Sequence, residues 1–181
     1  QASSSQTELK NNNVGPGDLF LFFGWFKNFS TNGRDLHHLF GWLQIEKIIE
    51  GSKEIERYLR ENNIQHPHGY GDTSKFSNNT IYIAKKKLEL NERKIFDRGY
   101  GLFRHTHNDL ILTEKNKTRS RWKLPSKYFQ DSKDLFLNRM KWEDKEESTV
   151  FYRGFGQEFI LDIEKNPKVK KWAINLIQKH G

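Results

Sequence analysis

Two short segments of this chain share an unusual core, in which a glycine inside an aromatic run is followed at once by a tryptophan. They are Leu21–Phe26, with the sequence LFFGWF, and Leu39–Leu43, with the sequence LFGWL. A glycine inside a strand marks a bulge, or a place where another backbone or a ligand comes close. Trp25 and Trp42 could therefore be stacking surfaces of a pocket for a flat ligand. They would equally suit a tightly packed corner of a sheet.

Each run extends into a predicted strand. The first strand covers about Leu19–Phe26 and the second covers Leu39–Ile49. The connection between them, Lys27–Leu36, contains Asn32-Gly33, which is a strong turn signal. Two apolar runs joined by such a turn favour antiparallel pairing.

Helical patterns occur farther along the chain. Apolar spacing predicts one helix within Ser52–Asn62, and another from Pro167 to just before Gly181. Short strands dominate, helices come at intervals, and no βα unit repeats. This order is typical of an α+β protein with a curved or barrel-like mixed sheet and flanking helices. The chain has 181 residues and no evident linker, so we expect a single domain over residues 1–181.

Positive charge is concentrated in one segment. The chain has 31 Lys and Arg against 23 Asp and Glu, and residues 83–123 hold 12 of the basic residues and only 5 of the acidic ones. Aromatic residues interleave with these charges. Basic side chains that follow phosphates, with rings available for stacking, are typical of a surface that binds nucleic acid. The alternative is a solvated basic face above core aromatics.

The absence of cysteine excludes disulfides, thiolate metal sites and cysteine nucleophiles in this chain. It is consistent with a cytoplasmic protein, which is the location we expect. No apolar stretch approaches the roughly 18 residues of a membrane span, so we expect no membrane partner.

Six of the seven histidines come in close pairs. His66 and His68 flank a proline in a predicted loop, where the stiff backbone could aim both rings at a base, a phosphate or the neighbouring backbone. His37 and His38 are adjacent in a predicted strand, so they should point to opposite faces and cannot easily share a metal. The His66/His68 pair has no nearby carboxylate at a fixed spacing. We therefore predict no metal site and assign no cofactor.

Gln157 and Glu158 follow two glycines, Gly154 and Gly156. A glutamine can bond the edge of a base as both donor and acceptor. Glu158 could act as a general base if a partner raised its pKa. The alternative is a turn at the start of a strand, with two solvated polar side chains.

Arg119, Arg121 and Lys123 alternate with Ser120 and Trp122. On an extended segment the three basic residues would share one face, with Trp122 packed behind them. They are therefore candidates for phosphate contacts, unless they form an ordinary solvated edge.

Signatures of familiar enzymes are missing. The chain has no phosphate-binding loop, no dinucleotide fingerprint and no nucleophile elbow, and without cysteine it lacks the deaminase signature. The sequence therefore leaves open whether the protein is an enzyme.

Several segments resemble, in the same order, the nucleotide-modification-associated domain of the third type. The segments are Val14–Phe26, Asp35–Ile45, His66–His68, Asn79–Ala84, Ser120–Pro125 and Gly156–Asp162. Members are bacterial and phage proteins placed in nucleic-acid modification systems. The resemblance implies a nucleic-acid or nucleotide ligand, with other proteins of such a system as possible partners. It supplies no reaction. Members usually extend upstream of the position that matches Gln1, which implies that this chain lacks its natural N-terminal part.

A second resemblance concerns the fold. A short helix, a Gly-Asp turn, an apolar strand and a glycine-containing strand are similar to the start of PUA-like barrels, including EVE-type domains. Some of these barrels hold an extruded or modified base in an aromatic pocket, so this likeness implies a modified base as ligand.

Three hypotheses follow. The first is a binding module for a nucleotide or a modified base in nucleic acid. It would use the two tryptophans for stacking, His66, His68 and Gln157 as polar readers, and the three alternating basic residues for phosphates. The second is an enzyme of base or nucleotide modification, with Glu158 and a histidine such as His66 or His68 as acid and base. The third is a structural or protein-interaction domain, in which the tryptophans are core.

Overall fold

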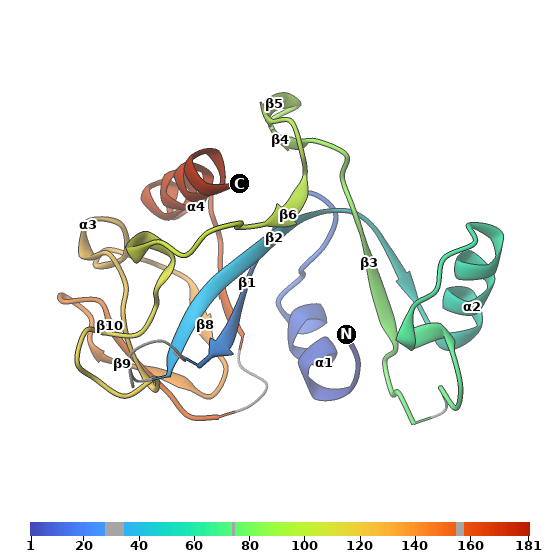
Figure 1. The fold of residues 1–181 in the computed structure, drawn as a ribbon, viewed down its shortest axis with the longest axis horizontal. Coiled ribbons are helices and arrows are strands. Elements are labelled where there is room, and N and C mark those ends of the chain that lie inside the picture. Colours follow the sequence, from blue (N-terminus) through green and yellow to red (C-terminus); the bar gives the residue numbers. More distant parts are fainter. Residues whose placement is uncertain (28–34, 74, 155–157) are drawn as a thin grey trace.

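The computed structural model describes residues 1–27, 35–73, 75–154 and 158–181. Helices and short strands alternate irregularly in this part of the chain, as expected for an α+β protein (Figure 1). The α-helices are α1 (Ser3–Asn11), α2 (Ser52–Glu61), α3 (Ser126–Phe129) and α4 (Pro167–His180), and the 3₁₀ turns are η1 (Pro67–Gly69) and η2 (Asn108–Leu110).

The strands are β1 (Leu19–Phe26), β2 (Leu36–Glu50), β3 (Thr80–Ala84), β4 (Leu88–Leu90), β5 (Arg93–Phe96), β6 (Tyr100–Leu102), β7 (Arg121–Lys123), β8 (Leu135–Leu137), β9 (Met140–Asp144), β10 (Thr149–Tyr152) and β11 (Phe159–Leu161). They form separate sheets, and no sheet in the described ranges closes into a barrel. The expected barrel is therefore absent from this part of the chain, and the PUA-like likeness gains no support.

β2 is the long central strand of the fold. Its first half pairs with β1 in the predicted antiparallel hairpin, with a shift in register between Phe22 and Phe23. Its second half pairs with β3, and its middle pairs with β6. β2 curves across Figure 1 and joins the half that carries α2 and β3 to the half that carries β7–β11.

The glycine in β2 is needed because another backbone comes close. A Cβ atom on Gly41 would lie 2.7 Å from the carbonyl oxygen of Gly101 in β6. This confirms one of the two roles that the glycine-interrupted strand predicted. At Gly24 in β1 the nearest atoms belong to the aromatic rings of Phe26 and Phe40, so there the close contact is with side chains.

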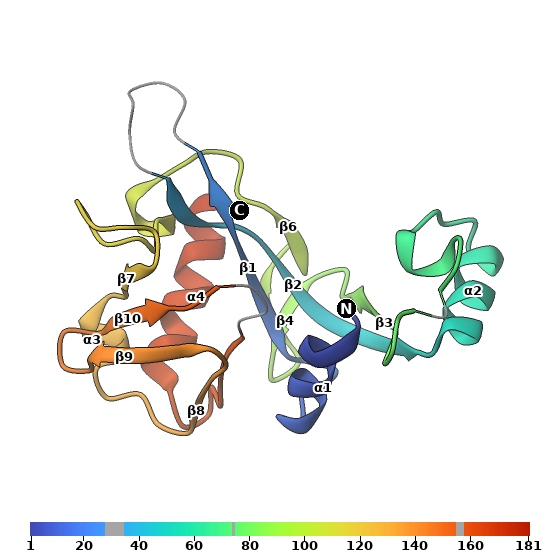
Figure 2. The ribbon, with the colours of Figure 1, turned by 90° about the horizontal axis from the view of Figure 1, so that it is seen from below.

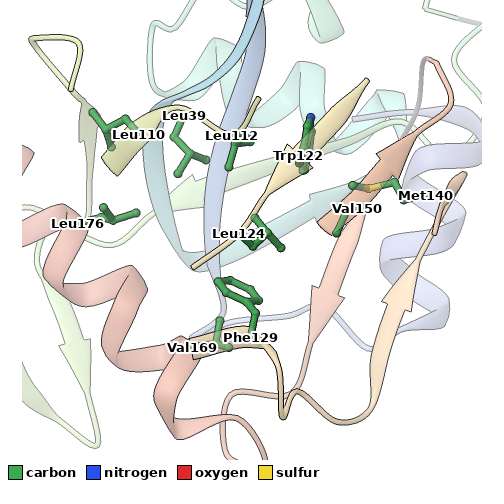
Figure 3. Packing of buried hydrophobic residues seen from close by; sticks show 10 residues of the cluster. All are labelled: Leu39, Leu110, Leu112, Trp122, Leu124, Phe129, Met140, Val150, Val169 and Leu176. Atoms are coloured by element: carbon green, nitrogen blue, oxygen red, sulfur yellow. The ribbon is translucent and has the colours of Figure 1, made fainter. Parts of the chain in front are cut away.

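The main core lies between the hairpin, the three-stranded sheet β7–β10–β9 and α4 (Figures 1 and 2). Trp122 and Val150 face inward from β7 and β10, where they are directly paired. Leu39 enters from β2, and Leu176 from α4. Figure 3 shows these side chains meeting in one cluster. The end of β1 and the strand β7 are thus held together by a shared core.

No helix within the described ranges is both long and apolar enough to cross a membrane.

Candidate nucleic-acid interface

The ring of Trp25 lies at the end of β1, just beyond the core. Alternate residues of a strand face the same side, so Trp25 continues the row of Leu21 and Phe23. Those two pack inward, whereas Trp25 remains 50% exposed. Its Nε1 donates a 2.8 Å hydrogen bond to Oδ2 of Asp35. The indole is therefore held in place while half of its surface faces solvent.

Arg119 stacks on this ring. Its guanidinium carbon lies 4.0 Å from the centre of the Trp25 ring, well inside the range of a cation–π contact. We call Trp25, Asp35 and Arg119 the tryptophan edge. The predicted site residues Trp25 and Arg119 are almost a hundred positions apart in sequence, and the fold brings them into contact.

His37 is the residue of β2 that pairs with Trp25 across the hairpin, and it is 2% exposed. Its Nδ1 accepts a 2.9 Å hydrogen bond from Nε1 of Trp122, and its ring centre is 4.3 Å from that of Tyr152. Burial, helped by the nearby positive charge of Arg119, lowers the pKa of His37 to about 4. His37 is therefore a neutral structural support for the edge.

His38 points to the other side of the sheet, as the strand geometry predicts. Its Nε2 lies 2.9 Å from Oγ1 of Thr106, and its ring makes an edge contact with Phe26. The prediction that the adjacent histidines would point to opposite faces of the strand is confirmed.

Arg121 and Lys123 lie on the exposed side of β7, and the buried Trp122 packs behind them. This alternation matches the prediction for an extended segment. On the same side, Phe151 of β10 is paired with both Arg121 and Lys141 of β9. The Nζ atom of Lys141 lies 5.9 Å from the centre of the Phe151 ring. We call Arg121, Lys123, Lys141 and Phe151 the basic face.

Arg119 departs from the prediction that three basic residues would share one face. It lies in the turn before β7, and its side chain reaches Trp25 instead. Because only one residue separates it from β7, Arg119 connects the tryptophan edge to the basic face.

Two cations of the basic face have carboxylate partners. Arg121 lies 3.2 Å from Oε1 of Glu143, and Lys123 lies 2.6 Å from Oε2 of Glu147. Ion pairs at such exposed positions contribute at most about 1 kcal/mol each, and salt weakens them. A phosphate can therefore compete with these carboxylates for the cations.

Trp42 does not join this surface. It is 1% exposed and packs with Leu88 and Ile177, and its ring also contacts Phe103. A Cβ atom on Gly101 would come within 2.4 Å of the indole. Its burial corrects the interpretation of Trp42 as a stacking surface, because no ring face is open. For this tryptophan the core interpretation fits.

The pair His66 and His68 belongs to a network that fastens η1 to the start of β3. The ring of His68 bonds the side-chain oxygen of Asn79 through Nδ1 and stacks on Phe76, with 5.2 Å between ring centres. Asn79 in turn donates to the carbonyl oxygen of His68 at 2.9 Å. His66 Nδ1 accepts from the His68 amide, and burial lowers the pKa of His66. The two rings thus have structural partners within their own loop.

Glu158 is half buried and bonds across to the turn between β8 and β9. Its Oε2 accepts a 2.5 Å hydrogen bond from Nδ2 of Asn138, and its carbonyl oxygen accepts from the Asn138 amide at 3.0 Å. Gln157 lies outside the described residues. β8 and α2 lie in opposite halves of the molecule in both views, so the fold separates Glu158 from the histidines near α2 (Figures 1 and 2).

An open cleft of about 1600 Å³ lies between α1, β1, β3 and the segment from β11 to α4. Glu158 and His66 line it at different places. Of the described residues that line the cleft, seven are Asp or Glu and only two are Lys. An acidic cleft repels phosphates, so it is less suited to a nucleic-acid backbone than the basic face is.

Sequence reasoning missed Asp35, Phe151 and Lys141. Asp35 precedes β2 and looked like part of the loop, and Lys141 lies in a charged stretch that has no clear period. The alternation of Lys141, Trp142 and Glu143 was the available signal, because it has the same period as Arg121–Lys123.

Comparison with known proteins gave one result. No curated protein and no solved structure matches the chain significantly. The family model described as nucleotide modification associated domain 3 matches residues 1–162, which is most of the chain. That family is named for its association with nucleotide modification. The chain belongs to the nucleotide modification associated domain 3 family.

Proposed function

We propose that this chain is the nucleic-acid- or nucleotide-binding module of a nucleotide-modification system. A base stacks on the exposed side of Trp25, and phosphates contact the basic face. The observation that carries the proposal is the contact at 4.0 Å between Arg119 and the half-exposed ring of Trp25. Arg119 lies only two residues before Arg121 of the basic face.

The tryptophan edge has the properties of a stacking platform. Asp35 fixes the indole through its Nε1, so little side-chain freedom is lost when a base binds. Arg119 leaves the ring partly open and adds a positive charge close to the site where a nucleotide phosphate would lie. Base–aromatic stacking contributes roughly 1–3 kcal/mol per base and tolerates any sequence, because every base has a flat π-face.

The basic face supplies the backbone contacts. Arg121 and Lys123 project from one side of a short strand, with Phe151 between the cations of β7 and β9. A single-stranded nucleic acid that runs from Trp25 past Arg119 to Arg121 would place its phosphates near successive cations. Single-stranded ligands suit such a surface because their bases are free to stack.

Replacing Trp25 by alanine should weaken binding of single-stranded oligonucleotides or nucleotides about 5- to 150-fold, the equivalent of one lost stacking contact. Plain and modified nucleotides, single-stranded DNA and duplex DNA are titrated by isothermal calorimetry. The matched control is Tyr100→Ala, because Tyr100 is 54% exposed and lies outside the tryptophan edge and the basic face. Equal losses for the two variants, or no loss for Trp25→Ala, would contradict the proposal.

The basic face makes a separate prediction about salt. Each phosphate contact that is lost should reduce the slope of log K against log salt by about 0.7 for a single strand. The double variant Arg121→Gln, Lys123→Gln should therefore show a clearly flatter salt dependence than the unchanged chain. Lys168→Gln is the control, because Lys168 is an exposed lysine of α4 that also has a carboxylate partner, Asp131. If the affinity of the unchanged chain did not vary with salt concentration, the phosphate contacts would be excluded.

A further inference from the structure

A second group of polar side chains gathers away from the proposed interface, where the C-terminal end of α4 meets η2. Asp109 lies within η2, His107 directly precedes it, and His180 is the last residue of α4. One potential ligand atom from each residue lies within 4.8 Å of the other two. The fold thus joins two histidines that are 73 positions apart in sequence, with a carboxylate between them.

The carboxylate oxygen Oδ2 of Asp109 is the centre of the group. It lies 3.4 Å from Nδ1 of His107 and 3.3 Å from Nε2 of His180. Tetrahedral zinc with bonds of about 2.0–2.1 Å holds its ligand atoms roughly 3.3 Å apart. Two edges of a zinc tetrahedron are therefore already present in the arrangement of these side chains.

We propose that His107, Asp109 and His180 bind a zinc ion, with water as the fourth ligand. Two imidazole nitrogens and one carboxylate form a donor set that zinc favours. Magnesium and calcium favour sites built mainly from oxygen, which this group does not provide. The site goes beyond the proposed binding function, and neither depends on the other.

The positions of the ligands are well supported by their neighbours. Leu110, next to Asp109, is fully buried in the main core, and Ile177, one turn before His180, is fully buried as well. The two imidazole rings are 4.5 Å apart between centres. A site whose backbone is anchored on both sides loses little conformational freedom when the ion binds. A bound ion would tie the end of α4 to η2.

Two interactions within the group compete with binding of the zinc ion. Nζ of Lys179 forms a 2.7 Å ion pair with Oδ2 of Asp109, and the Asp109 amide donates a 3.1 Å hydrogen bond to Nδ1 of His107. Lys179 is 59% exposed in its side chain, so it can swing into solvent when zinc arrives. Removing its charge should tighten zinc binding, which makes Lys179 a diagnostic position.

Equilibrium dialysis of the tag-free chain against zinc tests the site. The unchanged chain should bind one zinc ion, and saturating zinc should raise its melting temperature by about 5 °C. His107→Ala and His180→Ala should each weaken zinc binding at least about tenfold. Lys179→Met should tighten it roughly fivefold, from the loss of one nearby positive charge. His105→Ala is the matched control and should bind zinc as the unchanged chain does, because His105 is an exposed histidine outside the group.

Cobalt absorption in the visible range reports the coordination without any variant. The strong bands of tetrahedral cobalt are expected with the unchanged chain and should be displaced by zinc. Failure of the unchanged chain to bind zinc would overturn the proposal. So would zinc binding that His180→Ala and His107→Ala leave unaltered, or that is lost in His66→Ala instead.

Discussion

Replacing Trp42 by alanine is expected to lower the free energy of unfolding by about 3–5 kcal/mol, the usual cost of removing a buried aromatic side chain. The indole is 1% exposed and fills the space between Leu88, Ile177 and the backbone of Gly101. Because β6 and the end of α4 close over the ring, the cavity left by alanine cannot collapse without moving both. Urea denaturation followed by circular dichroism measures the loss.

Trp42→Phe is the matched control for this loss. The indole Nε1 has no hydrogen-bond partner among the described residues, so phenylalanine gives up no polar interaction there. It keeps most of the apolar volume and should cost clearly less than alanine. A loss below about 1 kcal/mol for Trp42→Ala would show that the ring is not a core element. Trp42 would then again be a candidate for the binding site.

The second large effect concerns pH. The pKa of His37 falls from 6.5 to about 4 on folding because the ring is buried. Above pH 6.5 the imidazole ring is neutral in both the folded and the unfolded chain, so His37 does not make stability depend on pH there. Between pH 6.5 and about pH 4, His37 binds a proton in the unfolded chain but remains neutral in the folded chain. Stability should therefore decrease from pH 6.5 to about pH 4 and lose about 3 kcal/mol through this residue.

The variant His37→Gln isolates this contribution. A glutamine oxygen can accept the hydrogen bond from Trp122 but does not titrate, so the variant should lose less stability on acidification. Burial also lowers the pKa of His38 and His66, and both variant and unchanged chain share those contributions. The difference between the two denaturation series is therefore the quantity to measure. Parallel pH profiles would contradict a neutral, buried His37.

Local sequence patterns predicted the features that depend on a few neighbouring residues. The hairpin of β1 and β2 follows from two apolar runs and a turn signal between them. The exposed Arg121 and Lys123 around a buried Trp122 follow from the period of a strand. In each case the information lies within one or two segments, where the alternation of side chains decides which face is buried.

Burial that depends on distant segments could not be predicted. Trp25 and Trp42 occupy similar local patterns, yet only Trp42 is covered, by β6 and by the residues at the end of α4. Trp25 stands beyond the edge of the core, and there Arg119 arrives from a turn that extended geometry did not predict. His180 contacts Asp109 only because the packing of α4 against the core brings the end of this helix next to η2. These contacts are set by tertiary packing, which the period of a segment does not encode.

Nuclear magnetic resonance of the indole N–H groups shows directly whether a base stacks on Trp25. The chain has five tryptophans, and Trp25→Phe assigns the signal of interest. Addition of a single-stranded oligonucleotide should shift the Trp25 signal strongly, because a stacked base changes the field at the ring, and should leave the buried Trp42 signal nearly in place. Oligonucleotide binding that does not move the Trp25 signal would contradict stacking of a base on this ring.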